Sequence, residues 1–291
     1  MSELVLQSLY AGLLAGGYYA LIALGLTLIF GTMKVINLAH GEMVLLAAYI
    51  AYTAESVYGI NPVLAIPLAV AAVVLTSVMV YGLVSRIRQD RELNSLILTF
   101  GIGIVLTNFV LMVWSADIRS TNVPWFNEPV VIGEALYSTS AQVLFFLAGL
   151  GLTAALWWWL GRSWYGRALR AVASNRNAAM LMGVNPRTTE VISFVIAGLL
   201  AGIAGVALYT VAVIHPDLGH NLTIKAFVIT VLAGLGSIPG VLVGAMLIGV
   251  AEYMTITLAS SALQELTGMV MFLLVLFIRP SGLFGSRGRV G

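Results

Sequence analysis

Long apolar stretches alternate with short polar ones along the whole chain of 291 residues. Most stretches approach the roughly 20 residues that an α-helix needs to cross a bilayer core. They are predicted at residues 9–30, 43–52, 62–85, 95–114, 141–160, 191–214, 224–235, 241–258 and 263–278. The pattern predicts an all-α fold, a polytopic transmembrane helical bundle of about eight spans that forms a single domain over residues 1–291.

Two apolar stretches are short and adjoin polar, glycine-containing segments, residues 31–42 and 234–240. Irregular backbone at membrane depth persists only where it is buried or lines a cavity. Broken segments in both halves of a transporter indicate its substrate pathway. We therefore expect two broken or re-entrant segments that contribute to a translocation pathway. The candidates in these segments are Asn37, His40, Glu42, Gly236, Ser237 and Pro239. An alternative for the first segment is a turn at the cytoplasmic face, with His40 and Glu42 in water.

Glu252 is a further pathway candidate because it lies inside the apolar stretch 241–258. A carboxylate at such a position needs a partner, a proton or water. A pathway or inter-subunit role and a structural hydrogen bond both fit this position. Asn108, in the stretch 95–114, is expected to join two helices by a hydrogen bond. His215, Asp217 and His220 have no recognised metal-ligand spacing, so we expect a solvated outer loop and no metal site.

Composition excludes several classes of protein. Hydrophobic residues make up 60% of the chain and charged residues 9%, whereas about a quarter of an ordinary soluble domain is charged. The net charge of +2 is localised at loops and does not indicate nucleic-acid binding. The chain has no cysteine, and neither of its two lysines, Lys34 and Lys225, ends a P-loop. We therefore expect no catalytic residues and no ATP hydrolysis by this chain.

The longest polar interruption, residues 161–187, carries five arginines and no acidic residue. Loops rich in arginine stay in the cytoplasm, so this segment sets the orientation of the chain. The arginines near residues 86–91 and 279–289 place the C-terminus on the same side. The segment between the fourth and fifth spans contains Asp117, Glu128 and Glu134 against Arg119, and it is predicted to be external.

The cytoplasmic segment is predicted to contain a short helix. Ser174 or Asn175 can cap its start, and Gly183 is typical of a residue just beyond a helix end. The residues before that glycine, Met180 to Met182, are apolar. Two hypotheses explain an apolar cytoplasmic helix: it lies on the membrane surface, or it docks into a groove of a partner protein.

Motifs along the chain resemble those of one transporter family. Asn177-Ala178-Ala179, followed by Gly183, resembles the "EAA…G" coupling loop of ABC importer permeases, with Asn where many carry Glu. The motifs around this loop and in both broken segments resemble the branched-chain amino-acid permeases of the LivH/LivM type, closer to LivH. They are Gly166-Arg167-Ala168, Gly183-Val184-Asn185, the run from Asn37 to Glu42 and the run from Gly234 to Gly240. The resemblance covers essentially the full chain.

The resemblance implies a permease subunit that forms the inner-membrane translocation pathway of an ABC importer in bacteria, for branched-chain or related amino acids. It implies four kinds of partner: membrane lipid, a second, LivM-like permease, two cytoplasmic ABC ATPase subunits and a periplasmic solute-binding protein. ATP would be bound by the ATPase subunits, so no cofactor is expected in this chain. The residues expected to couple the chain to the ATPase are Arg167, Arg170, Arg176, Asn177, Ala178, Ala179, Met180, Leu181, Met182 and Gly183. Two alternatives remain: a related permease for urea, short amides or other small solutes, and a secondary transporter or channel that works alone.

Overall fold

The computed structural model describes residues 2–87, 89–133 and 136–285, and this part of the chain is largely helical. Its helices are α1 (Ser2–Met33), α2 (His40–Tyr58), α3 (Ile66–Val84), α4 (Arg91–Trp114), α5 (Pro124–Asn127), α6 (Ser140–Arg162), α7 (Trp164–Ser174), α8 (Arg176–Leu181), α9 (Pro186–Val211), α10 (Leu218–Ala233), α11 (Ile238–Leu258) and α12 (Gln264–Ile278). Short 3-10 helices span Pro62–Ala65 and Ser261–Leu263, and β1 (Pro129–Ile132) pairs with β2 (Leu136–Thr139) in an antiparallel hairpin. The predicted all-α fold is confirmed.

Seven helical segments within the described residues are long and apolar enough to cross a membrane. They contain α1, α3, α4, α6, α9, α11 and α12. The apolar helix α10 has 16 residues, and α2 has 19. The stretch predicted at residues 191–214 begins earlier, at Pro186, because Asn185 caps α9 and Pro186 occupies its first turn. Proline is accommodated there because the amide it lacks would have no helical partner.

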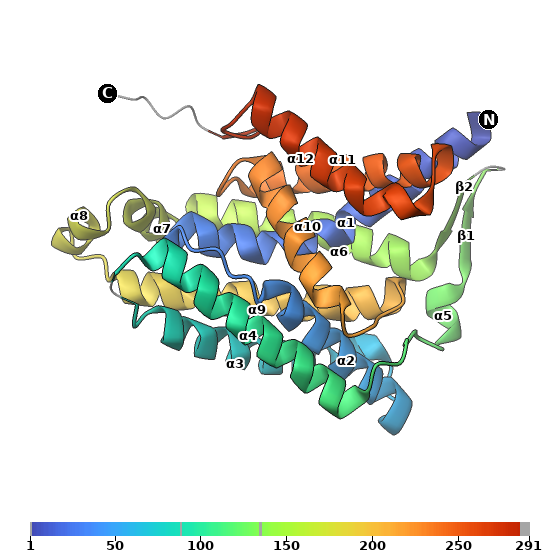
Figure 1. Cartoon of the computed structure of the whole chain (residues 1–291), viewed down its shortest axis with the longest axis horizontal. Helices are drawn as coiled ribbons and strands as arrows, with labels where there is room; N and C mark the ends of the chain where they lie inside the picture. Colours follow the sequence, from blue (N-terminus) through green and yellow to red (C-terminus); the bar gives the residue numbers. More distant parts are fainter. Residues whose placement is uncertain (1, 88, 134–135, 286–291) are drawn as a thin grey trace.

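The bundle has two chemically different ends. Figure 1 shows α7 and α8 together at one end, with α5, the β1–β2 hairpin and the start of α1 at the other. The α7–α8 end carries Arg162, Arg167, Arg170, Arg176 and Arg187, so the positive-inside rule makes it the cytoplasmic end. The opposite end is then external. Arg287 and Arg289, which also entered the predicted orientation, lie outside the described residues.

The chain re-enters the bundle between α1 and α2. Residues 34–39 turn back from the cytoplasmic end of α1, and α2 begins inside the bundle (Figure 1). His40 Nε2 lies 2.8 Å from the carbonyl oxygen of Ile22. Ile22 precedes the last residue of α1, Met33, by 11 residues, or about 16 Å at 1.5 Å per residue. The start of α2 therefore lies near the middle of the membrane, which confirms the first predicted re-entrant segment.

The second re-entrant segment lies earlier in the sequence than predicted. The amide of Gly41 donates to Thr223 Oγ1 at 2.9 Å, so the start of α10 lies beside the start of α2. Ile214, four residues before α10, pairs with Arg119 of the external segment. The chain thus enters from the external end at about residue 217. Residues 234–237, in contrast, turn between α10 and α11 beside Gly31 near the cytoplasmic end of α1.

Close helix packing in the core depends on small residues. Gly198 and Gly202 of α9 face α3. A Cβ atom added at Gly202 would lie only 2.7 Å from the Cα of Val70. Gly12 and Gly16 of α1 lie against α11 in the same way. Small residues in α9 and α1 therefore allow the close approach of neighbouring helices.

The orientation can be tested by thiol labelling, because the chain contains no native cysteine. A Ser120→Cys variant should react with a membrane-impermeant maleimide added to intact cells, since Ser120 follows the external bridge residue Arg119. A Ser174→Cys variant, at the end of α7, should react only after the membrane is permeabilised. Reaction of the residue 174 site in intact cells would reverse the assigned orientation. Ser286, a third suitable position, lies outside the described residues.

Candidate functional site

The cytoplasmic end presents a capped helix with an apolar tip, which consists of Met180, Leu181 and Met182. The Asn175 side chain accepts hydrogen bonds from the amides of Asn177 and Ala178 at 3.1 and 3.0 Å. Gly183 follows the helix with φ of +81°. The predicted cap and stop are therefore both confirmed. The tip side chains are 46%, 88% and 83% exposed, whereas Ala179 is buried. The tip thus projects away from the rest of the chain.

The predicted single helix of this loop is in fact preceded by a longer one, α7, which anchors it. Tyr165 of α7 is buried, and its hydroxyl lies 2.5 Å from Ser193 Oγ of α9 and donates to the carbonyl of Thr189 at 3.1 Å. Burial raises the pKa of Tyr165 to about 12, so the phenol stays protonated. The α7–α8 segment is consequently held on the cytoplasmic start of α9.

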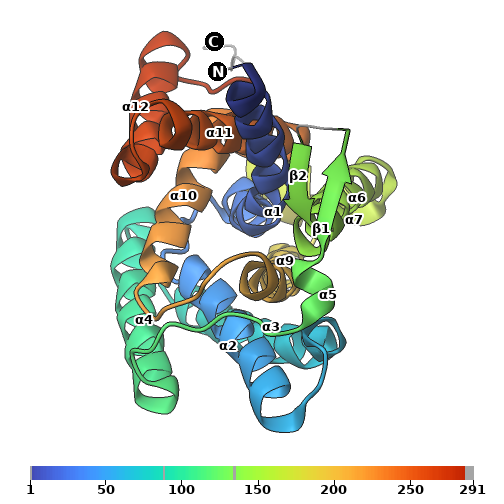
Figure 2. The same cartoon turned by 90° about the vertical axis from the view of Figure 1, so that its right-hand side faces the viewer.

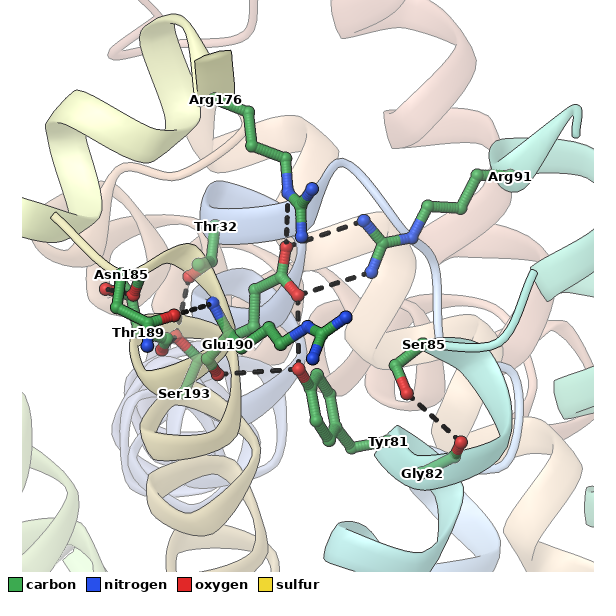
Figure 3. Close-up of polar contacts among 11 residues, drawn as sticks. Thr32, Tyr81, Gly82, Ser85, Arg91, Arg176, Asn185, Thr189, Glu190 and Ser193 are labelled. Atoms are coloured by element: carbon green, nitrogen blue, oxygen red, sulfur yellow. Dashed lines mark hydrogen bonds and ion pairs between the residues drawn. The ribbon is translucent and has the colours of Figure 1, made fainter. Parts of the chain in front are cut away.

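A buried carboxylate, Glu190 of α9, joins the α7–α8 segment to three membrane helices, α9, α4 and α3 (Figure 3). Its Oε1 accepts from Arg176 Nε of α8 at 3.1 Å and from Arg91 Nη1 of α4 at 3.4 Å. Its Oε2 accepts from Arg91 Nη2 at 3.4 Å and from the Tyr81 hydroxyl of α3 at 3.3 Å. We call these four residues the Glu190 cluster. A buried carboxylate is stable here because two cations and a hydroxyl compensate it.

The arginines predicted to contact the ATPase are partly used within the chain. Arg176 belongs to the Glu190 cluster with a side chain that is 44% exposed. Arg170 donates to the carbonyl of Leu160 at 3.1 Å, and Arg167 donates to that of Arg162 at 3.2 Å. Glu190 was not among the candidates predicted from the sequence. Its signal was an acidic residue in the first turns of a span that directly follows an arginine-rich loop.

The three polar residues of the first re-entrant segment are buried. Asn37, His40 and Glu42 are 0%, 0% and 5% exposed. The alternative of a solvated cytoplasmic turn is therefore wrong, because re-entry places these residues at mid-membrane. Within the described residues, Asn37 Nδ2, His40 Nδ1 and Glu42 Oε2 have no hydrogen-bond partner. Unpaired polar atoms in the interior are costly, and the pathway role of these three residues stays a prediction.

Gly236, Ser237 and Pro239 lie apart from those residues. Ser237 caps α11 by accepting from the amide of Gly240, and Pro239 lies in its first turn. Together with α6 and α7 they line a cavity of about 250 Å³. The predicted position of this break within the membrane is thus corrected: the segment is a helix–helix turn at the cytoplasmic end.

Glu252 has partners from three helices. It accepts from Lys225 Nζ of α10 at 2.9 Å, from the Tyr19 hydroxyl of α1 at 2.7 Å and from Gln264 Nε2 of α12 at 3.2 Å. Of the three options predicted for this carboxylate, a partner, a proton or water, the structure shows partners. Lys225 was not predicted from the sequence as the partner of Glu252. Its signal was a lysine within an apolar stretch, opposite in charge to a glutamate in the next one.

The structure also places two further residues that were singled out from the sequence, Asn108 and His215. The Asn108 side chain is exposed and donates to the carbonyl of Ile104 in its own helix at 2.8 Å. Among the described residues it therefore joins no second helix, so the predicted hydrogen bond between helices is not seen. Among the described residues, no group of three or more His, Cys, Asp or Glu side chains is placed to hold a metal ion, His215 and its neighbours included.

The contact between the two re-entrant helices allows a stability prediction. A Cβ atom added at Gly41 would overlap with the carbonyl oxygen of Gly219 and the amide nitrogen of Thr223. We expect Gly41→Ala to destabilise the protein by about 1–3 kcal/mol through overpacking. Gly82→Ala is the matched control, because no atom lies within 4 Å of a side chain built there. Thermal unfolding in detergent measures both. Equal midpoints for Gly41→Ala and wild type would contradict the close approach.

The sequence is similar to known transport proteins over nearly its whole length. Residues 8–279 match the family described as "branched-chain amino acid transport system / permease component". The chain is 33% identical to the high-affinity branched-chain amino acid transport system permease protein BraD of Pseudomonas aeruginosa, over 96% of this chain and 95% of BraD. It is 32% identical to LivH of Escherichia coli, with the same coverage. It is 27% identical to a probable LivH of Methanocaldococcus jannaschii, over 91% and 88%. No solved structure matches the chain.

Proposed function

Because the chain belongs to the family of permease components of branched-chain amino acid transport systems, we propose that it forms the translocation pathway for branched-chain or related amino acids in an ABC importer. The observation that carries this proposal is the capped, apolar tip at the cytoplasmic end. An exposed tip of Met180, Leu181 and Met182 fits an apolar groove on a partner better than it fits water.

The proposed partners follow from what this chain contains. With no P-loop lysine, it needs separate ATPase subunits that bind and hydrolyse ATP at the cytoplasmic end, and it carries no cofactor itself. A solute-binding protein would deliver substrate at the external end. A second, LivM-like permease would complete the pathway. The exposed apolar faces of α4 and α12 supply the surface for that subunit and for lipid.

The Glu190 cluster gives the proposed coupling a physical route. When the ATPase subunits close on ATP, a tip held in their groove moves with them. Arg176 is the first residue of α8, and its ion pair with Glu190 passes that displacement to α9. Arg91 and Tyr81 extend it to the cytoplasmic ends of α4 and α3. The permease would then change the face to which its pathway opens.

Competition for uptake tests the proposed substrate class. The complete transporter, expressed in a strain without its own branched-chain uptake, should accumulate radiolabelled L-leucine. Unlabelled L-isoleucine and L-valine should compete, whereas urea, acetamide and fructose should not. Accumulation of urea or acetamide without L-leucine uptake would assign the chain to a different substrate.

A further inference from the structure

A cavity of about 270 Å³ lies in the external half of the bundle, between α1, α9, α10, α11 and α12. It extends from Tyr19, near the middle of α1, to Gln264 and Glu265 in the first turn of α12. Figure 2, which faces the external end, shows α1, α10, α11 and α12 grouped around this region. The volume is near the lower limit for ligand pockets, so the cavity suits one small molecule.

The polar side of the cavity is built around the Glu252 carboxylate, whose residue is 1% exposed. Three donors converge on its Oε2: Tyr19, Lys225 and Gln264. Within the described chain, Oε1 accepts no hydrogen bond. It faces Gly268 of α12, which also lines the cavity and has no side chain to cover it. One carboxylate oxygen is thus fixed, and the other remains available as an acceptor.

Lys225 provides the complementary group. Its ammonium donates to Glu252 Oε2 and to the Tyr19 hydroxyl, both at 2.9 Å, and lies 4.3 Å from the centroid of the Tyr19 ring. An ammonium has three donors, so one remains after these two bonds. The side chain is 19% exposed and lines the cavity. A positively charged hydrogen-bond donor therefore lies beside a negatively charged acceptor that has no partner.

A second acceptor lies at the external rim. Glu265 is exposed and accepts from Asn221 Nδ2 at 3.0 Å through Oε1. The apolar part of the lining consists of Leu208, Leu222, Val228 and Ile248, which we call the apolar wall. The cavity consequently combines one cationic donor, two carboxylates and an aliphatic wall.

We propose that this cavity is a binding subsite for a zwitterionic amino acid with an aliphatic side chain. The substrate carboxylate bonds the third N–H of Lys225, and its ammonium group bonds Glu252 Oε1 and the Glu265 carboxylate. The aliphatic side chain packs on the apolar wall. This inference rests on the proposed function and adds to it the residues that select the substrate within the membrane.

A purely structural role explains the arrangement less well. Ionised groups in a membrane-spanning bundle carry a large desolvation cost. A neutral hydrogen bond would join α10 to α11 without that cost. A ligand that brings both charges compensates the free donor and the free acceptor together, whereas an isolated cation or anion leaves one of them unsatisfied.

The test measures L-leucine binding to the complete transporter in nanodiscs, without the binding protein. Wild type should bind radiolabelled L-leucine. Lys225→Met and Glu252→Gln should weaken its affinity about tenfold or more, the effect of one lost charged contact. Arg119→Gln is the matched control, since it removes a charge at the external end outside the cavity and should leave binding unchanged.

Two ligand fragments separate recognition from folding. Glu265→Gln alters an exposed side chain and should therefore leave folding intact. This variant should bind L-leucine more weakly, and also 3-methylbutan-1-amine, which has only the ammonium group. Its affinity for 4-methylpentanoate, which has only the carboxylate, should be unchanged. Lys225→Arg should retain 4-methylpentanoate binding. The subsite is overturned if wild type accumulates L-leucine with ATP yet binds none, or if Glu265→Gln affects both fragments equally. Absence of L-leucine uptake by wild type would instead overturn the proposed function.

Discussion

Replacing Leu181 with aspartate is expected to abolish ATP-driven uptake, with membrane levels of the protein unchanged. Leu181 is 88% exposed, so its replacement should change the stability of the isolated chain little. In a complex, the same position would carry an unpaired carboxylate into an apolar groove. That costs several kcal/mol, which is more than a contact of three side chains is able to offset.

Leu181→Met is the matched control for this prediction. It keeps an apolar side chain of similar volume, a type of exchange that packing tolerates, and should transport like wild type. The measurement is L-leucine uptake in vesicles with equal amounts of each variant. Wild-type uptake by Leu181→Asp at matched protein level would remove the coupling role of the tip.

Replacing Glu190 with alanine should both destabilise the protein and reduce uptake more than tenfold. The change leaves Arg91 and Arg176 without their shared partner. Removing one partner of a fully buried pair costs about 3–5 kcal/mol. These arginine side chains are 25% and 44% exposed, so water compensates part of the loss and the cost falls below that range. The tip then loses its ionic link to α9.

Two comparisons make this prediction specific. Glu92→Ala removes an exposed carboxylate from the first turn of α4, close to Arg91, and should change neither stability nor uptake. Glu190→Gln keeps the side-chain size and the hydrogen bond to Tyr81 but removes the charge. If coupling depends on the ion pairs, ATP hydrolysis by the purified Glu190→Gln transporter should continue while uptake falls. Normal uptake by Glu190→Ala would show that the cluster transmits nothing.

Features that depend on neighbouring residues were predictable from the sequence. The membrane helices follow from apolar length, and the α8 boundaries follow from Asn175 and Gly183, whose effects are confined to one turn. The assignment of the cytoplasmic side rests on equally local information, because the arginines of residues 161–187 are contiguous in the chain, and it stays a prediction until the labelling experiment is done.

Features that depend on depth or on distant partners were not predictable. The Gly234–Gly240 run has the composition of a broken helix, yet it forms a turn at the cytoplasmic end. The re-entrant start of α10 at Leu218 has a less obvious local signal. It packs against the start of α2, where Gly41 bonds to Thr223, a residue 182 positions away in the sequence. Likewise, Glu252 meets Tyr19 across 233 residues, a pairing that a single sequence does not encode in any local pattern.

The central claim, that this permease works only with an ATPase, is tested most directly in proteoliposomes. The complete transporter is reconstituted with ATP sealed on the cytoplasmic side and the binding protein outside. L-Leucine should accumulate with ATP but not with a non-hydrolysable analogue, and vesicles without the ATPase subunits should accumulate none. Accumulation driven by a proton or sodium gradient in vesicles that contain this chain without an ATPase would contradict the claim.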